Sequence, residues 1–460
     1  MFGSRNGSRW ALVGVIALAV ALFIPGAYRN LAADKEQTYE GLKIFSDVID
    51  MVQKNYVDEV DSKKLIEDAI QGMVSSLDPH SALLTPDALK ELQIDTQGEF
   101  TGIGIHVTMR DNVVTVIAPI DGTPAYNAGI KAGDKIIKVD GTSVDNLTDA
   151  VKRMRGPKGT EVTITVIRDN EPKPLEFKLI RDVIPIQSVR STVLQPGYGY
   201  VWVTHFRENT ADDLEAALEK MEKSEKPLKG LILDLRDNPG GVLDQAIRIS
   251  DMFIDEGIIM TSKGRLDRHT RVYTATKSAT SRTYPMVVLI NGGSASASEI
   301  VAGALQDDKR ALILGTTSFG KGSVQAIENL RDGYALKLTI ARYYTPSGRS
   351  IQAKGVEPDI VVPHQILEEA APEKERLFKE RDLANHLQGD SEKEAPASKE
   401  KAPEPKQDTK DKDKDKGKES EPARTRLSPL SPEQLVKDSQ VRRALDILIS
   451  YEVFKKLGNG

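Results

Sequence analysis

The sequence predicts an α/β core, a mixed β-sheet covered by helices, with a smaller strand-rich domain inserted ahead of it. Apolar strands alternate with amphipathic helices over residues 185–366, which is typical of an α/β fold. Residues 96–184 instead hold short strands separated by glycine turns. A helical region precedes these two parts and a helix follows them, so the 460 residues are expected to form several domains.

Residues 1–33 are predicted to be a signal peptide or membrane anchor. Arg5 and Arg9 precede an apolar run from Trp10 to Ile24, a pattern typical of exported proteins. Because no clean cleavage site with small residues follows, an uncleaved anchor is favoured over a removed signal. The positive charges favour an N-terminus inside the cell. We therefore expect an exported protein, periplasmic or anchored in the inner membrane, with its domains outside the cytoplasm.

Residues 34–95 are predicted to be helical because apolar side chains recur there at helical spacing. One apolar face is formed by Leu42, Phe45, Val48, Ile49 and Val52, and a second by Leu65, Ile66, Ala69, Ile70 and Met73.

The end of the chain changes in composition. Residues 367–430 are rich in Lys, Asp, Pro and Ser and have little to bury, so they are predicted to be a disordered linker. Residues 431–460 are predicted to form a helix that starts at Pro432, with Val441 and Leu445 on its apolar face. This helix is expected to dock on the N-terminal helices or on a second subunit.

Residues 96–184 carry a specific signature. A strand over Val113–Ile117 precedes the run Ala-Gly-Ile-Lys-Ala-Gly-Asp, and a helix over Leu147–Met154 and a strand over 162–168 follow. This order resembles a PDZ domain, a class that binds an extended peptide as an added strand at a sheet edge. The resemblance implies a peptide-binding segment made of Thr101, Gly102, Ile103, Gly104 and Ile105, in which a loop over residues 101–104 offers backbone N–H groups to a terminal carboxylate. The alternative is a small β domain that only packs on the core.

Two motifs follow strands of the predicted core: residues 293–299 read GSASASE, and residues 319–325 read FGKGSVQ. A serine hydroxyl needs a base to take its proton, and a largely neutral lysine can be that base. Burial disfavours an ammonium group, and the apolar strand before Lys321 would place the lysine in partly dry surroundings. Gln325 is expected one helical turn beyond Lys321, where its amide would hold the amine toward the serine. The pair predicts acyl-transfer chemistry on peptide bonds.

A phosphate-binding loop is the main competing interpretation of the lysine motif. Residues 315–321 fit the pattern G-x-x-x-x-G-K, but the next position must be Ser or Thr to reach Mg²⁺. That position is Gly322, and Ser323 comes one place too late. Nucleotide binding is therefore disfavoured.

A third motif follows the buried strand over residues 230–235 and reads RDNPGG. Paired glycines after a core strand allow backbone N–H groups to point into a cleft, where they can stabilise an oxyanion. The candidate donors are Gly240, Gly241 and Ala297. The alternative is an ordinary Asn-Pro-Gly-Gly turn.

In combination, these motifs resemble those of the C-terminal processing peptidases, also called tail-specific proteases, and the similarity runs from about residue 39 to residue 363. The resemblance implies an α/β serine protease core with an inserted PDZ domain, an N-terminal helical region and a C-terminal helix. It implies that Ser296 is the nucleophile, Lys321 the general base and Gln325 its orienting partner. The choice of Ser296 over its two neighbouring serines rests on the family motif and not on spacing.

The resemblance also implies a function. The expected protein is a serine endopeptidase that cleaves exported or envelope proteins near C-terminal or unstructured segments, with a PDZ domain that captures substrate and gates the site. Its partners would be proteins or peptides with accessible C-termini, and there is room for a regulatory or adaptor protein and for a homodimer. The alternative is a non-catalytic PDZ scaffold that recruits protein C-termini, which the complete set of Ser296, Lys321 and Gln325 disfavours.

Composition argues against several other classes of protein. The net charge is -5 and no basic face stands out, so nucleic-acid binding is not expected. The absence of cysteine excludes disulfides and cysteine-based metal sites. The six histidines show no His-x-x-x-His spacing, so neither a catalytic metal nor another cofactor is expected.

Overall fold

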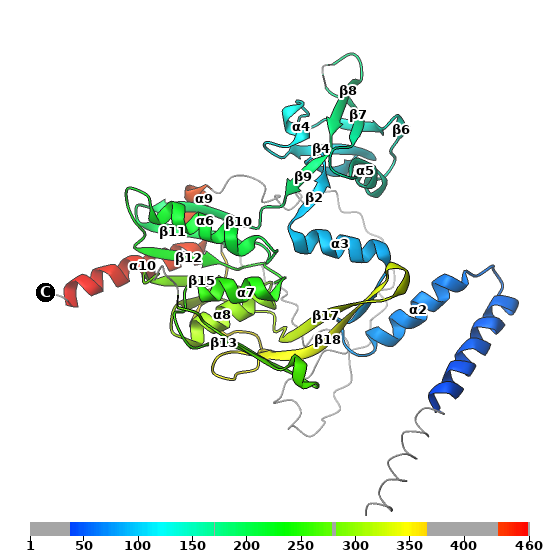
Figure 1. Ribbon diagram of the computed structural model, residues 1–460. Coiled ribbons are helices and arrows are strands. Elements are labelled where there is room, and N and C mark those ends of the chain that lie inside the picture. The colour runs from blue at the N-terminus through cyan, green and yellow to red at the C-terminus, as the bar shows by residue number, and fades with distance from the viewer. Residues whose placement is uncertain (1–36, 170, 278–281, 366–430, 459–460) are drawn as a thin grey trace, which may run out of the picture. The chain divides into compact units, whose positions relative to one another are not determined.

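The computed structural model describes residues 37–169, 171–277, 282–365 and 431–458 (Figure 1). The chain divides into two compact units, residues 1–76 and residues 77–460. Within the described part, no helix combines the length and the apolar character that a membrane crossing requires. The predicted signal or anchor and the predicted linker both lie outside the described residues.

The described part of the N-terminal unit consists of two helices, in line with the predicted helical region, but the rest of that region, residues 77–95, also contains a short strand over Ala82–Leu84. The first helix covers residues 37–55, and the second, α2, spans Ser62–Ser75. Asp61 caps α2, because its carboxylate accepts a hydrogen bond from the N–H of Lys63 at 2.8 Å. The exposed apolar side chains of the two helices include Leu42, Phe45, Val48, Ile66 and Met73.

A six-stranded sheet forms the centre of the core (Figure 1). Its order is β10-β11-β12-β15-β16-β19, and every neighbouring pair is parallel except β10 and β11 at one edge. The strands are β10 (Val189–Gln195), β11 (Tyr198–Val203), β12 (Gly230–Asp234), β15 (Met286–Ile290), β16 (Leu312–Gly315) and β19 (Ile360–Val361). All residues of β12 and β15 are buried, as expected of parallel strands that are covered on both faces.

Helices cover both faces of this sheet, so successive side chains of β12 pack alternately into two apolar clusters, one on each face. Leu231 and Leu233 face the larger apolar cluster, while Ile232 between them faces the cluster on the other side. The helices of the larger cluster are α6 (Thr210–Glu222), α7 (Leu243–Asp251) and α8 (Ala297–Asp307).

The C-terminal helices cover the second face. They are α9 (Pro432–Lys437) and α10 (Ser439–Gly458), drawn in red in Figure 1. The prediction that this helix docks on the N-terminal helices or on a second subunit was wrong. Val441, Leu445 and Leu448 pack against the central sheet of their own chain, because that apolar face needs a cover and α10 supplies it.

A second sheet lies beside the core helices and has the order β1-β18-β13-β14, with β17 paired to β18. Its strands are β1 (Ala82–Leu84), β13 (Ile258–Gly264), β14 (Arg271–Thr274), β17 (Ser323–Asn329) and β18 (Ala335–Tyr344). Three short helices accompany it: α3 (Pro86–Gln97) and the 3-10 turns η1 (Asp267–His269) and η2 (Arg331–Gly333). Lys321 lies just before β17, and the last three residues of its motif begin that strand.

The inserted domain has its own sheet and its own apolar core. The sheet order is β3-β4-β5-β7-β8, with β6 paired to β5, and two helices pack on it. The elements are β3 (Ile105–Arg110), β4 (Val113–Pro119), α4 (Pro124–Asn127), β5 (Lys135–Val139), β6 (Thr142–Ser143), α5 (Leu147–Met154), β7 (Glu161–Ile167) and β8 (Leu175–Ile180). The chain enters through β2 (Glu99–Gly102) and leaves through β9 (Asp182–Pro185), which pair as an antiparallel ribbon.

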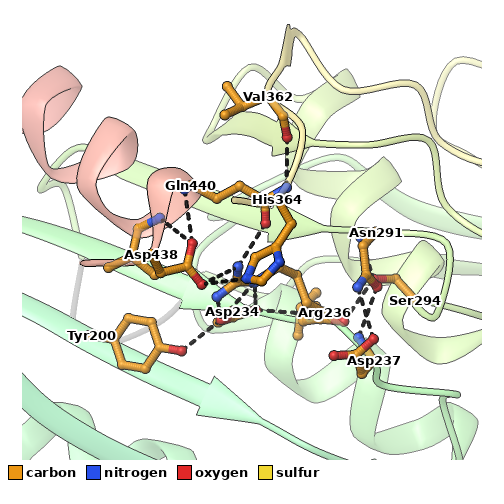
Figure 2. A network of polar contacts seen from close by, with 12 residues as sticks. Tyr200, Asp234, Arg236, Asp237, Asn291, Ser294, Val362, His364, Asp438 and Gln440 are labelled. Carbon is orange, nitrogen blue, oxygen red and sulfur yellow. Dashed lines mark hydrogen bonds and ion pairs between the residues drawn. The ribbon is translucent and has the colours of Figure 1, made fainter. Parts of the chain in front are cut away.

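A buried ionic cluster fixes the C-terminal helices to the core (Figure 2). Arg236 follows β12 and forms an ion pair with Asp234 at the end of that strand. The same guanidinium donates to Asp438 and to Gln440, both at 2.7 Å, at the start of α10. His364 contacts the Asp438 carboxylate at 3.3 Å. One arginine therefore joins the central sheet to the last helix of the chain.

Gln365, which directly precedes residues 366–430, is also held to Ser439 at the start of α10. The N–H of Ser439 donates to the carbonyl of Gln365 at 3.0 Å, and the Ser439 hydroxyl accepts from the N–H of Gln365 at 2.9 Å. The same hydroxyl donates to the carbonyl of Pro363 at 3.1 Å.

Asp438→Asn is expected to lower the free energy of unfolding at neutral pH by about 2 kcal/mol, because it removes one of the two carboxylates that pair with the guanidinium of Arg236. Burial disfavours the ionised carboxyl of Asp438, but the hydrogen bond from His364 and the charge of Arg236 outweigh burial and hold its pKa well below 3.8. A lowered pKa gives stability that is present above the ordinary value and is lost on acidification.

Urea unfolding across pH should therefore show a gap between wild type and Asp438→Asn at neutral pH that shrinks as the pH falls below 3.8. Asp446→Asn, a change of the same type at an exposed position on α10, is the control and should leave stability nearly unchanged. Equal stability of Asp438→Asn and wild type at neutral pH would contradict the role of the cluster.

Candidate active site

The serine motif and the Gly-Gly motif lie where the neighbouring parallel strands β12 and β15 end, at the carboxyl edge of the central sheet. Asn291, just after β15, joins the two loops. Its side chain accepts from the N–H of Asp237 and donates to the Asp237 carboxylate, both at 2.9 Å (Figure 2). The sheet thus brings together two motifs that are far apart in the sequence.

Ser296 is the residue that precedes α8, and its backbone is strained. Its φ is 55°, a region that L-residues other than glycine, Asn and Asp rarely occupy. Such strain persists only where the surroundings hold the residue in place, and it is common at functional sites. The Ser296 N–H donates to the Glu299 carboxylate at 2.9 Å, and its carbonyl accepts from the Tyr343 hydroxyl at 3.0 Å.

The geometry separates Ser296 from its two neighbouring serines. Ser294 and Ser298 are fully buried. Their hydroxyls donate to the carbonyls of Leu235 and Asn238, each at 2.8 Å. Ser296 is half-buried, and it lines a cleft. The prediction of Ser296 as the nucleophile rested on the family motif alone, and these contacts add a physical reason for it.

The cleft beside Ser296 is mostly apolar and has a volume of about 350 Å³. Its apolar lining comes from Leu92, Phe206, Val242, Leu243, Ile300, Val324 and Ile327. His205, which no sequence motif singled out, also lines it, and burial together with the charge of Arg207 lowers the pKa of its imidazole. A small or medium apolar side chain of a substrate fits this lining.

Lys321 is half-buried and sits between two glycines ahead of β17. Its N–H donates to the Glu299 carboxylate at 2.9 Å, and its carbonyl accepts from Tyr343. Gly322 is required by close approach, because a Cβ there would lie 2.8 Å from the main-chain nitrogen of Gln352, and Gly320 is favoured by its φ of 103°. The main chains of Ser296 and Lys321 therefore share the same two bridging side chains.

The expected helical relation between Lys321 and Gln325 was wrong. Gln325 lies on strand β17, where four residues span about 13 Å rather than one turn of a helix. Its amide nitrogen donates to the hydroxyls of Ser323 at 2.9 Å and Thr339 at 3.3 Å. Gln325 does line the same cleft as Ser296, so its predicted role as a partner of Lys321 stays a prediction.

The three candidate oxyanion donors differ in whether their N–H group already donates a hydrogen bond within the protein. The N–H of Gly240 already donates to the Asn238 side chain at 2.9 Å. Within the described residues, no hydrogen bond is donated by the N–H of Gly241 or of Ala297, the first residue of α8. A Cβ on Gly240 would lie 2.9 Å from the nitrogen of Ala297 and from the Cβ of Ser296, so this turn directly adjoins the serine. Gly241 with Ala297 is the better pair.

Asn238 and Tyr343 complete the site, and neither was selected as a site residue from the sequence. Asn238 is fully buried, and its side chain donates to the Val203 carbonyl at 2.8 Å while its own carbonyl accepts from Ala295 at 3.0 Å. It holds the Gly-Gly turn against the serine loop. The Asn-Pro-Gly-Gly run after a buried strand was the sequence pattern that could have pointed to Asn238, but that run fits an ordinary turn equally well.

Glu299 is fully buried at the start of α8. Its carboxylate accepts from the N–H groups of Ser296, Gly320 and Lys321 and from the hydroxyl of Ser318. Burial raises the pKa of Glu299 to about 7, although these hydrogen bonds favour the ionised form. Glu299 belongs to the GSASASE motif, but its contacts could not be inferred from that motif.

The five residues predicted to bind peptide in the inserted domain fall into two parts. Thr101 and Gly102 are not in a loop, because they belong to β2 and pair with Val183 and Asp182 of β9. Ile103 and Gly104 form the connection, and Ile105 begins β3. Strand β3 is at the edge of its sheet, which leaves one side available for an added strand.

A metal site was not expected. Within the described residues, no group of three or more His, Asp or Glu side chains is placed to hold a metal ion.

Known protein families match three parts of the chain. Peptidase family S41 matches residues 197–362, the PDZ domain matches 101–179, and the activating protease CtpB N-terminal domain matches 26–87.

Curated relatives match most of the chain. It is 46% identical over 373 residues to the carboxy-terminal-processing protease of Bartonella bacilliformis, which covers 79% of this chain and 85% of that protein. It is 37% identical over 353 residues to the carboxy-terminal processing protease CtpA of Bacillus subtilis, covering 76% and 75%. A solved structure of the photosystem II D1 C-terminal processing protease is 32% identical, with a TM-score of 0.41, and covers 69% of this chain and 92% of that one.

Proposed function

The chain belongs to the carboxy-terminal processing proteases of peptidase family S41, serine-type peptidases, and carries a PDZ domain, and on this premise we propose a Ser-Lys mechanism. Ser296 is the nucleophile and neutral Lys321 is the general base. The strongest support is the difference between Ser296 and its two neighbouring serines. Ser294 and Ser298 are buried and their hydroxyls donate hydrogen bonds to carbonyls, whereas Ser296 lines the cleft.

In the proposed reaction, Lys321 takes the proton of the Ser296 hydroxyl as its oxygen attacks the substrate carbonyl. The N–H groups of Gly241 and Ala297 donate to the oxyanion that forms. The protonated Lys321 then gives its proton to the leaving amine. Water then attacks the ester on Ser296 while Lys321 takes a proton from that water, and Lys321 returns this proton to the Ser296 oxygen as the acyl group leaves as a carboxylic acid.

Substrate capture is the task of the PDZ domain in this proposal. The open edge of β3 accepts an extended C-terminal segment as an added strand. The apolar cleft beside Ser296 then receives an apolar side chain near the bond to be cut. The substrates are exported or envelope proteins with unstructured or accessible C-termini, and residues 1–33 anchor the enzyme or direct its export. A regulatory partner and a homodimer are further parts of the proposal.

Gating by the PDZ domain is also proposed, and the β2–β9 ribbon allows a clean test. Gly102 pairs with Asp182, so residues 103–181 can be replaced by a short glycine-serine turn that closes the ribbon. The chain without residues 1–33 should cleave an unfolded protein with an apolar C-terminus, and a PDZ-binding peptide should stimulate it. The PDZ-less variant should show raised basal activity without stimulation.

A failure of the gating proposal and a failure of the peptidase proposal would give different results. Equal basal activity with and without the PDZ domain would contradict gating but leave the protease. If neither the chain with the PDZ domain nor the PDZ-less variant cleaved any substrate, with or without peptide, the proposed peptidase mechanism would be contradicted.

A further inference from the structure

Two segments far apart in the chain carry the proposed nucleophile and base, and one buried carboxylate binds both. One oxygen of Glu299 accepts from the N–H of Ser296 and from the N–H of Lys321, each at 2.9 Å. The other accepts from the N–H of Gly320 at 2.7 Å and from the Ser318 hydroxyl. We propose that Glu299 is a positioning residue that sets the distance and orientation between Ser296 and Lys321. This inference rests on the proposed Ser-Lys mechanism.

The chemistry of the contacts requires a carboxylate. An ionised carboxylate only accepts hydrogen bonds and has about four lone-pair positions, which the four donors fill. The Ser318 hydroxyl itself accepts from the N–H of Val356 at 2.6 Å, so its proton points to Glu299. A glutamine at this position would turn an NH₂ group toward at least one pair of these donors. A neutral glutamine of the same shape therefore cannot accept all four of these hydrogen bonds.

The contacts hold the main chain of the two reacting residues themselves. Ser296 has a strained backbone, and a strained residue keeps its conformation only when its surroundings determine it fully. Glu299 fixes the N–H side of Ser296 and Lys321, and the Tyr343 hydroxyl bridges their carbonyls. Misplacing a reacting group by about 1 Å can cost about 100-fold in rate.

The test is Glu299→Gln in the full-length protein at about pH 8.5, above the pKa of about 7 at which the carboxyl ionises. We expect kcat to fall about 100-fold while KM changes by less than about threefold, because the PDZ domain and the apolar cleft are not altered. The rate at which a fluorophosphonate labels Ser296 should fall in parallel, since it reports the nucleophile without the substrate.

The matched control is Asp307→Asn at the other end of α8. The Asp307 carboxylate accepts from the N–H of Ser347 at 3.0 Å and from Arg349 at 3.0 Å, so the change also removes an anchored carboxylate. It should lower Tm but leave kcat within about threefold. If Glu299→Gln likewise lowers only Tm, with kcat and labelling at wild-type rates, the inference is overturned.

Two safeguards keep the outcome clear. A wild-type protein that is neither active nor labelled at Ser296 would count against the proposed function itself, not against Glu299 alone. If Glu299→Gln fails to fold, Ser318→Ala removes one of the four donors and should lower kcat several-fold with KM unchanged. An unchanged kcat in a folded Ser318→Ala protein would then overturn the positioning role.

Discussion

Ser296→Ala is expected to lower the rate of peptide hydrolysis on the order of 10⁴-fold or more, because the acyl-enzyme can no longer form. The side chain of Ser296 lines the cleft, and its backbone hydrogen bonds to Glu299 and Tyr343 do not depend on the hydroxyl, so the variant should fold normally. Ser294→Ala and Ser298→Ala are the matched controls. Each removes a buried hydrogen bond and should cost about 1–3 kcal/mol of stability while leaving kcat nearly unchanged below the melting temperature.

Mass spectrometry after an acid quench gives a direct readout of the same prediction. Wild type should carry a substrate-derived acyl group on the proteolytic fragment that contains Ser296, and the alanine variant should carry none. Cleavage that survives Ser296→Ala would remove this residue as the nucleophile, and an acyl group on a neighbouring serine would reassign it.

Lys321→Ala and Lys321→Arg are both expected to lower kcat by about 10³-fold, which is the range of general acid–base catalysis. The arginine variant decides between two roles of the lysine. A guanidinium stays charged at any pH that the protein survives, so it can stabilise negative charge but cannot accept a proton. Equal losses in the two variants indicate a base, whereas activity retained in Lys321→Arg would show that only a positive charge is needed.

His205→Gln is the control for this prediction, because His205 lines the same cleft and its imidazole is a second group there that could take a proton. We expect its kcat within about threefold of wild type, measured as hydrolysis rate against pH. A loss in His205→Gln as large as in Lys321→Ala would point to histidine as the base.

Local patterns predicted local structure well. The helix α5 has the predicted bounds, Leu147–Met154, because its start signal is adjacent in sequence: Asn146 caps it by accepting from the N–H of Asp149 at 2.8 Å. The central strands were predictable for a similar reason, since parallel strands buried on both faces are continuous apolar runs.

Contacts between distant segments explain what the sequence could not show. Gln325 was expected on a helix, but the segment is a strand because it pairs with β18, a partner formed later in the chain. The bond from Lys321 to Glu299 spans 22 residues, and the bond from Tyr343 to Ser296 spans 47. No short-range pattern encodes such pairs, so the residues that hold the site together emerged only from the fold.

The hydrogen-bonded pair Gln365 and Ser439 has a consequence for the integrity of the enzyme. Residues 366–430 connect Gln365 to α9 in the sequence, and α10 is held to the core by this pair, by its apolar face and by Arg236. A protease that nicks this stretch would therefore yield two fragments that migrate apart under denaturing conditions but remain one particle in native buffer. The last helix would behave as a small subunit, and a one-chain enzyme would become a two-chain enzyme without dissociating.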